Sequence, residues 1–284
     1  MANILMKEVN VIIPTFNRAS KVVRAVCSVL KQTYKDFEIT VVDDGSNDNT
    51  SQSLAPYMEQ ITYILQPDNR GVSAARNTGI KASRSPLIAF LDSDDYWLPE
   101  KLNLQVGFMR KNPRIQICQT DEIWVRNGVR VNPGKKHKKP SGDIFEPSLK
   151  LCLVSPSAVM VRRPLFDDIG LFDEDFPVCE DYDLWLRISC NHEVRLIEEK
   201  MVVKEGGDDD QLSSSLKGID RFRIRAMVKL LKSGELNDIQ VKAVLKELEI
   251  KCQIYGKGCI KRGKNEEGKY FLSLPEDIEK GLKH

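Results

Sequence analysis

Short apolar segments of the kind that form β-strands alternate with helical patterns through the first hundred residues, and this alternation restricts the chain to few folds. The strand-like segments cover residues 9–14, 39–42, 61–65 and 87–91. After the first of them, apolar residues recur three and four positions apart, as on one face of a helix, and small residues predict another helix over 73–82. Strands that alternate with helices predict an α/β fold with a largely parallel sheet.

The charge balance and the apolar segments exclude two broad classes of protein. With 43 Lys and Arg against 41 Asp and Glu, the formal net charge is only +2. This is too even for a generic polybasic binder, so we expect no nucleic-acid partner. The longest unbroken apolar run covers residues 87–91, whereas a membrane-spanning helix needs roughly 20 residues.

The N-terminus and the cysteines predict a cytosolic protein. Residues 1–8 lack the basic stretch and apolar core of a secretory signal, and the seven Cys form no CxxC pair. In a chain of 284 residues we interpret them as reduced, mostly buried thiols. We therefore expect a cytoplasmic location, with at most a peripheral contact with the inner face of a membrane.

The pattern beyond residue 212 is helical, and residues 213–284 carry 16 basic and 10 acidic side chains, a net charge of +6. We expect a C-terminal extension of helices that covers the preceding domain and has a charged outer face. Its basic residues could also contact anionic lipid or a diphosphate-linked acceptor, and its apolar stripes leave a homodimer open.

A second basic run, Lys135–Lys139, lies in a segment, residues 125–142, that is interrupted by Gly and Pro. Such a composition is typical of a turn followed by a mobile, solvated loop. The alternative is a loop that attracts an anionic acceptor.

Two clusters of carboxylates follow predicted strands: Asp43 and Asp44 after one, and Asp92, Asp94 and Asp95 after another. In an open α/β sheet, ligands bind outside the carboxyl ends of the strands. Crowded carboxylates repel each other and raise one another's pKa, and a divalent cation would relieve this. Asp92 and Asp94 suit Mg²⁺ or Mn²⁺ that keeps positions for phosphate oxygens. The alternative is an Asp-rich turn in which Asp94 or Asp95 caps the helix expected near Pro99.

Five segments, in chain order, resemble the motifs of the family-2 glycosyltransferases. They are residues 11–18, 41–46, 69–77, 90–95 and 180–187. The resemblance extends to about residue 212. It implies the nucleotide-diphospho-sugar transferase (GT-A) fold, a Rossmann-like mixed sheet flanked by helices. The donor half would be about 1–100 and the acceptor half about 101–212, followed by the helical extension 213–284.

The resemblance also implies a site for the donor nucleotide. Its residues would be Pro14, Thr15, Asn17, Arg18, Asp43, Asp44, Arg76, Asp92 and Ser93. Asp43, with Asp44, would accept the N3–H of a uracil-like base. Arg76 would face the base or the diphosphate, and the alternative for this residue is an ion pair with a nearby Asp.

In the same resemblance, Asp94 and Asp92 would hold Mn²⁺ or Mg²⁺ against both phosphates of the donor. Related sequences often have a His after a Gly-Gly pair, ahead of Gln-Leu-Ser. Here Gly206-Gly207 is followed by Asp208. Asp208 could replace the imidazole as an oxygen ligand, or it could belong to a degraded site in an acidic loop.

Asp181 is the predicted catalytic residue. An inverting transfer needs a group that takes the proton of the acceptor hydroxyl, and in this family that group is the Asp of a Glu-Asp pair at the start of a helix. Glu180-Asp181 precedes such a helical pattern. The alternative is that these carboxylates only interact favourably with the helix N-terminus.

We therefore predict a metal-dependent inverting glycosyltransferase, with a nucleotide-diphosphate sugar, most simply a UDP-sugar, as donor. The acceptor would be a sugar or lipid-linked hydroxyl, in the biosynthesis of a cell-surface polysaccharide or glycolipid. Two alternatives are a sugar nucleotidyltransferase, whose Gly-rich first loop is missing from Pro14–Arg18, and a nucleotide-sugar-binding protein that has lost turnover.

Overall fold

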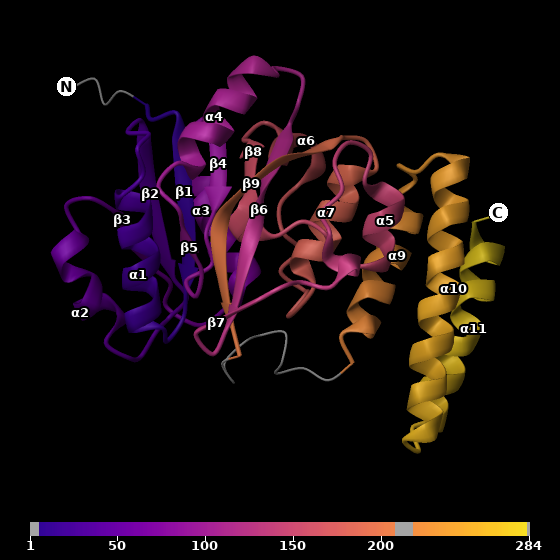
Figure 1. The fold of residues 1–284 in the computed structure, drawn as a ribbon. Helices are drawn as coiled ribbons and strands as arrows, with labels where there is room; N and C mark the ends of the chain where they lie inside the picture. The colour runs from indigo at the N-terminus through magenta and orange to yellow at the C-terminus, as the bar shows by residue number, and fades with distance from the viewer. Residues whose placement is uncertain (1–5, 208–217, 283–284) are drawn as a thin grey trace.

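The computed structural model describes residues 6–207 and 218–282. Within them the chain forms a nine-stranded mixed sheet, in the order β3-β2-β1-β4-β8-β6-β9-β5, with β7 paired to β6 (Figure 1). The strands are β1 Val9–Thr15, β2 Phe37–Asp43, β3 Thr62–Leu65, β4 Leu87–Phe90, β5 Tyr96–Trp97, β6 Ile117–Arg126, β7 Val129–Val131, β8 Val159–Arg162 and β9 Val194–Gly206. The predicted α/β fold is confirmed.

Helices cover both faces of this sheet and extend beyond one end of it (Figure 1). They are α1 Ala19–Leu30, α2 Thr50–Leu54, α3 Val72–Ala82, α4 Lys101–Lys111, α5 Phe145–Lys150, α6 Leu165–Ile169, α7 Glu180–Ser189, α9 Asp220–Ser233, α10 Asp238–Lys261 and α11 Asn265–Gly281, with short 3₁₀ turns η1 Ala55–Tyr57, η2 Lys135–His137 and η3 Pro156–Ala158. None of the helices in the described residues is long and apolar enough to span a membrane.

The first four strands are parallel, and their register aligns their carboxyl ends. β1 pairs with β2 and β4, and β2 pairs with β3. Thr15 at the end of β1 lies opposite Asp43, which lies opposite Leu65. β8 then enters antiparallel between β4 and β6, which makes the sheet mixed. The loops after β1, β2 and β4 therefore emerge at one edge.

Successive residues of the central strands enter opposite cores. Val11 and Ile13 of β1 pack with α1 and α4 on one face, whereas Ile12 packs with α7 on the other. This is the period-two alternation of a strand buried on both faces. The two cores fix the sheet between its helices and so fix the positions of the loops at its edge.

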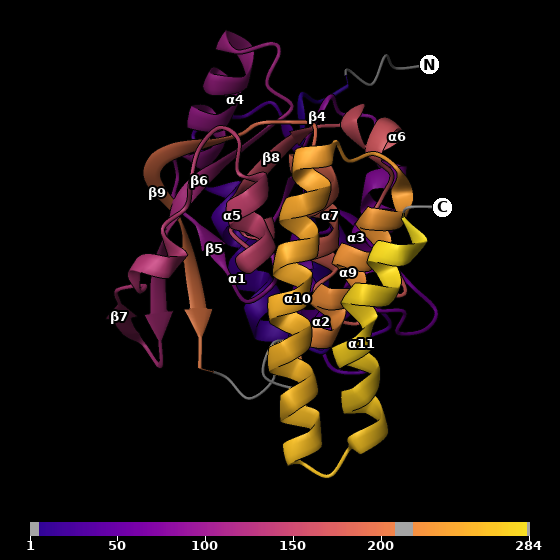
Figure 2. The same cartoon turned by 90° about the vertical axis from the view of Figure 1, so that its right-hand side faces the viewer.

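A third core joins the C-terminal helices to the rest of the protein. Tyr182 and Leu186 of α7 pack in it with Phe222 and Met227 of α9 and with residues of α10. Figure 2 shows α10 and α11 side by side as a long hairpin on the outside of this layer. The predicted helical pattern beyond residue 212 is confirmed for α9 and α10.

Two local features of the sequence can be compared with the structure, the turn after β4 and the segment 125–142. Asp94 and Asp95 do not cap the helix after them, because the two-residue strand β5 intervenes and α4 starts at Lys101 with Glu100 as its N-cap. The turn predicted within residues 125–142 is confirmed, because β6 and β7 form a hairpin whose turn places Asn127 and Gly128 at positive φ. The 3₁₀ turn η2 follows β7 in the basic run.

Candidate functional site

A cavity of about 640 Å³ lies at the carboxyl ends of the parallel strands. It is lined by the loop after β1, the turn after β4, the start of α3, the start of α7 and the end of β9. Most of the residues predicted for the donor, the metal and catalysis line this one cavity: Pro14, Thr15, Asn17, Arg18, Asp44, Arg76, Asp92, Ser93, Asp94 and Asp181.

Asp43 is not among the lining residues. Its carboxylate is buried, and it accepts hydrogen bonds from the backbone N–H of Ser46 at 2.8 Å and the hydroxyl of Tyr63 at 2.6 Å. Asp44 does line the cavity and accepts the N–H groups of Arg70 and Gly71 at 2.9 and 2.8 Å. Asp208 lies outside the described residues.

Asn17 connects the loops after β1 and β2. Its backbone N–H donates to Ser46 Oγ at 2.8 Å, and its Oδ1 accepts the N–H of Asn47 at 2.9 Å. The residue has φ of 51°, in the left-handed region that Asn tolerates better than most side chains. The sequence thus places an Asn where the loops after β1 and β2 must turn together.

Arg76 connects the two halves of the cavity. Arg76 is 3% exposed, and its guanidinium lies 2.7 Å from Asp92 Oδ1 and 2.7 Å from Glu180 Oε1. Burial alone would lower the pKa of Arg76, but the two carboxylates raise it, so the group stays charged. Arg76 thus forms the ion pair with a nearby Asp that was the alternative to a contact with the donor. Through Asp92 and Glu180 it joins the turn after β4 to the start of α7.

The turn formed by residues 92–95 places three carboxylates, of Asp92, Asp94 and Asp95, at the cavity. Arg18 contacts Asp94 Oδ2 at 2.8 Å, and Arg24 donates to the Asp94 carbonyl at 2.7 Å. Burial, with the neighbouring Asp92 carboxylate, raises the pKa of Asp94. Asp95 is 2% exposed, and its Oδ2 has no hydrogen-bond partner.

These carboxylates fit a divalent ion that completes its shell with a ligand's phosphates. Mg²⁺ commonly binds one or two carboxylates and keeps its other positions for phosphate and water, and Asp92 and Asp94 offer such a pair on one turn. In residues 6–207 and 218–282, no group of three His, Cys, Asp or Glu could by itself hold a metal.

Asp181 lies in the first turn of α7, after Cys179 in the left-handed region at φ 64°. Its Oδ1 accepts the backbone N–H of Tyr182 at 2.7 Å, and the thiol of Cys152 lies 3.5 Å from its Oδ2. Across the described part of the chain, no ion pair forms with Asp181. The Asp181 carboxylate therefore lines the cavity with a backbone N–H and a thiol as its hydrogen-bond partners.

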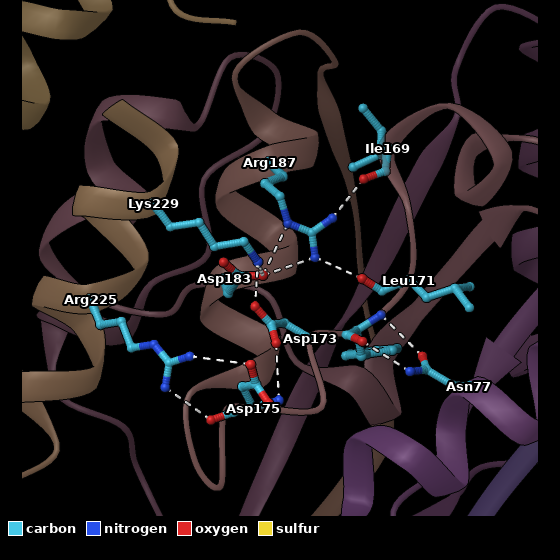
Figure 3. Close-up of polar contacts among 10 residues, drawn as sticks. Asn77, Ile169, Leu171, Asp173, Asp175, Asp183, Arg187, Arg225 and Lys229 are labelled. Carbon is cyan, nitrogen blue, oxygen red and sulfur yellow. Dashed lines mark hydrogen bonds and ion pairs between the residues drawn. The ribbon is translucent and has the colours of Figure 1, made fainter. Parts of the chain in front are cut away.

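A network of ion pairs fixes α7 from its other side (Figure 3). The buried Asp183 carboxylate accepts from Arg187 at 2.9 Å and from Lys229 of α9 at 3.0 Å. Lys229 also contacts Asp173 at 2.7 Å, in the loop whose Phe172 backbone bonds to Asn77 of α3. The helix that carries Asp181 is thus held by α3, by the loop before it and by the C-terminal extension.

Sequence reasoning missed two cations of the cavity, Lys204 of β9 and Arg223 of α9. Burial would lower the pKa of Lys204, but Glu122 and Asp95 raise it, so its ammonium stays charged. The sequence did contain a signal for Lys204, because a charged residue directly after the two apolar residues Val202 and Val203 is unusual in a buried strand. Arg223 reaches the cavity only through the packing of α9 on α7, which local sequence does not specify.

Glu180 gives a pH-dependent prediction. Burial and the Asp181 carboxylate raise the pKa of Glu180 from its ordinary value of 4.5 to about 7. The folded state therefore holds this proton more tightly than the unfolded chain, and the contribution of Glu180 to the free energy of unfolding falls as the pH rises from 4.5 to about 7. Since one pKa unit corresponds to about 1.4 kcal/mol, the upper bound on this fall is about 3 kcal/mol.

Glu180→Gln removes the titration, so urea unfolding at pH 5, 6, 7 and 8 should show a smaller loss of stability toward pH 8 than in the parent. Glu249→Gln, an exposed change on α10, is the matched control. If the free energy of unfolding changes with pH in the same way in the parent and in Glu180→Gln, the pKa of Glu180 is not raised in the folded protein.

Comparisons with known proteins agree on this architecture. The family model of Glycosyl transferase family 2 matches residues 10–170. The Escherichia coli protein UDP-Glc:alpha-D-GlcNAc-diphosphoundecaprenol beta-1,3-glucosyltransferase WfgD is 33% identical over 190 residues, which cover 66% of this chain and 72% of WfgD. Two uncharacterized glycosyltransferases, from Rickettsia felis and Rickettsia conorii, are 34% and 33% identical, and this chain spans about a third, 34%, of each.

Two solved structures share the fold. S. aureus TarS 1-349 in complex with UDP-GlcNAc superposes with a TM-score of 0.67 at 17% identity, covering 95% of this chain and 92% of that one. The mannosyltransferase PcManGT from Pyrobaculum calidifontis, in complex with GDP-Man and Mn²⁺, has a TM-score of 0.58 at 16% identity and covers 94% and 86%. At these identities the likeness establishes the fold alone.

Proposed function

This chain belongs to glycosyl transferase family 2, and we propose that it is a metal-dependent inverting glycosyltransferase that moves a sugar from a UDP-sugar to a hydroxyl of a lipid-linked acceptor. One observation carries the proposal. The Asp92–Asp94 turn and the Asp181 carboxylate line the same cavity, from opposite halves of the domain. A phosphate-binding floor and a proton acceptor are the two parts that such a transfer requires.

The donor would occupy the side of the cavity built by the loops after β1 and β2. Asp44 and Asn17 line it there, next to the cationic Arg18. A uridine base offers an N3–H that a carboxylate accepts, and Asp44 is the predicted carboxylate that reaches the cavity. The TarS complexes with UDP and UDP-GlcNAc, which share this fold, support a uridine donor.

In the transfer, Asp181 would take the proton of the acceptor hydroxyl as its oxygen attacks the sugar C1. The new C1–O bond forms while the bond from C1 to the diphosphate breaks on the opposite side, so the configuration inverts and UDP leaves. When bound at Asp94 and Asp92, Mn²⁺ or Mg²⁺ would neutralise charge on the leaving diphosphate. Arg18 and Lys204 add positive charge along the same wall.

The proposed acceptor is a lipid-linked sugar of a polysaccharide or glycolipid pathway. WfgD, whose name gives a GlcNAc-diphosphoundecaprenol acceptor, is the relative that supports it. An acceptor of this kind is held in a membrane. We therefore also propose that the C-terminal segment 213–284, which has a net charge of +6, contacts anionic lipid at the membrane surface.

The two alternatives predict different products. A nucleotidyltransferase would make a sugar nucleotide from a sugar phosphate, and a binding protein without turnover would release no UDP. A glycosyltransferase without acceptor leaks some sugar to water, so slow release of UDP from a UDP-sugar separates it from both.

A thermal-shift panel of UDP, GDP, dTDP and CMP, each with and without Mn²⁺, tests the donor assignment. A ligand at 100 times its dissociation constant adds about 2.7 kcal/mol to the free energy of unfolding, which moves the Tm by a few degrees. We expect a Mn²⁺-dependent shift with UDP. An equal shift with another nucleotide, or none with UDP, would contradict the uridine assignment.

Asp94→Ala is expected to abolish the Mn²⁺ dependence of UDP binding, because it removes the carboxylate predicted to bind both the ion and, through it, the phosphates. The measurement is UDP affinity by calorimetry with and without Mn²⁺. Asp277→Ala, on the exposed side of α11, is the control and should keep the parent's dependence. Full Mn²⁺ dependence in Asp94→Ala would show that the ion binds elsewhere.

A further inference from the structure

A second cavity of about 640 Å³ opens between the basic loop after β7 and helix α5. Lys136, Lys138 and Lys150 line it together with one carboxylate, Glu146. All three ammonium-bearing side chains are exposed, and in the described ranges none of them forms an ion pair. The cavity therefore has an excess of two positive charges that no protein group neutralises.

The basic loop is fixed by the last lysine of its run, Lys139. Lys139 is 8% exposed, and its ammonium lies 2.9 Å from Glu122 Oε1 and 3.2 Å from the Thr120 carbonyl. Burial would raise the pKa of Glu122, but Lys139 and Lys204 lower it to about 2, so the pair stays ionic. The His137 ring also packs on Trp124, with centroids 5.1 Å apart.

This anchoring matters because breaking a buried ion pair leaves an uncompensated charge, which keeps Lys139 paired with Glu122. With Lys139 turned into the protein, its neighbours Lys136 and Lys138 are placed at the mouth of the second cavity. Figure 2 shows the loop after β7 lying beside α5, which supplies Lys150 and Glu146. The cations are therefore presented by two fixed elements.

The second cavity adjoins the first through a single segment. Leu151 and Leu153 line the second cavity, whereas Cys152, between them, lines the first. The Cys152 thiol lies 3.5 Å from Asp181 Oδ2. Residues 151–153 therefore contribute to the lining of both cavities, and the cavity with the three lysines lies next to the one that Asp181 lines.

We propose that the second cavity binds the diphosphate group of the acceptor, and this inference rests on the proposed function. Ammonium groups bind phosphate oxygens as point charges without a fixed geometry, and a diphosphate matches the uncompensated positive charge. Pro140, Pro147, Leu151 and Leu153 supply an apolar wall in the same cavity. That wall suits the first carbons of a lipid chain attached to the second phosphate.

The test compares two triple variants of the full chain. Lys136→Gln/Lys138→Gln/Lys150→Gln neutralises the cavity, and Lys31→Gln/Lys81→Gln/Lys111→Gln makes the same charge change at exposed positions on or next to α1, α3 and α4. Each is assayed with two acceptors that have the same sugar, one linked to a short alkyl chain by a diphosphate and one as the neutral alkyl glycoside.

For the diphosphate acceptor, we expect the cavity variant to raise KM by 10-fold or more, with kcat and the donor KM unchanged. The neutral glycoside should show no such increase, and the control variant should match the parent with both. An unchanged KM in the cavity variant, or an equal rise for both acceptors, would overturn the proposal.

A binding measurement separates this inference from the proposed function. Inorganic pyrophosphate is titrated into each protein in metal-free buffer by calorimetry. The cavity variant should bind at least 10-fold more weakly than the parent and the control. Equal binding by all three proteins overturns the site. If the cavity variant binds pyrophosphate more weakly but the parent protein transfers no sugar, the second cavity is still a diphosphate site. In that case the diphosphate does not belong to a glycosyl acceptor.

Discussion

Asp181→Asn is expected to lower the rate of sugar transfer by about 10²-fold or more, the scale on which a general base contributes. The amide keeps the size of the side chain, and its oxygen can still accept the N–H of Tyr182, so the start of α7 should be preserved. It cannot take up the proton of the acceptor hydroxyl. Affinity for UDP should be almost unchanged, because the proposed donor site is built by the loops after β1 and β2 and does not include Asp181.

The measurements are kcat for transfer and the Kd of UDP with Mn²⁺. Asp168→Asn, on the exposed side of α6, is a control with the same chemical change. Transfer near the parent rate in Asp181→Asn would remove Asp181 from the role of general base. A parallel loss of UDP binding would instead indicate damage to the cavity as a whole.

Arg76→Met is expected to lower the free energy of unfolding by about 3 kcal/mol or more, measured by urea unfolding at pH 8. Breaking a buried ion pair by removing one partner leaves an uncompensated charge, which typically costs about 3–5 kcal/mol. Here one cation serves two carboxylates, Asp92 and Glu180, each 2.7 Å away. At pH 8 both are ionised, so the cost is largest there.

A second substitution tests whether this cost comes from the stranded carboxylates. In Arg76→Met/Glu180→Gln one of them is neutral, so the double variant should be more stable than Arg76→Met alone. Arg76→Lys keeps the charge but loses the planar fork that contacts two partners, and it should fall between the parent and Arg76→Met. A cost below about 1 kcal/mol for Arg76→Met would contradict the structural role of the bridge.

The strands of the parallel part were predictable because their apolar residues belong to segments buried on both faces. The segments over 9–14, 39–42, 61–65 and 87–91 agree with β1 to β4 within two residues at each end. β5 has two residues and exists only through its pairing with β9, about a hundred positions away. Such a strand has no local periodicity to detect.

It was also predictable that side chains after β1, β2 and β4 line one cavity, because the carboxyl ends of parallel strands meet at one edge of the sheet. What could not be predicted was how the two halves connect. Arg76 and Glu180 are 104 residues apart in the sequence, and no spacing rule relates them. Lys139 shows the same limit, since one lysine of a basic run is buried against Glu122 while its neighbours stay exposed.

An inverting transfer from a UDP-sugar is tested most directly by the anomeric configuration of the product. The full chain is incubated with Mn²⁺, an α-linked UDP-sugar and a sugar-diphosphate-lipid acceptor, and the new linkage is assigned by NMR from the coupling of its anomeric proton. We predict a β-linked product formed in step with the release of UDP. An α-linked product, or release of sugar phosphate and UMP in place of UDP, would contradict the account.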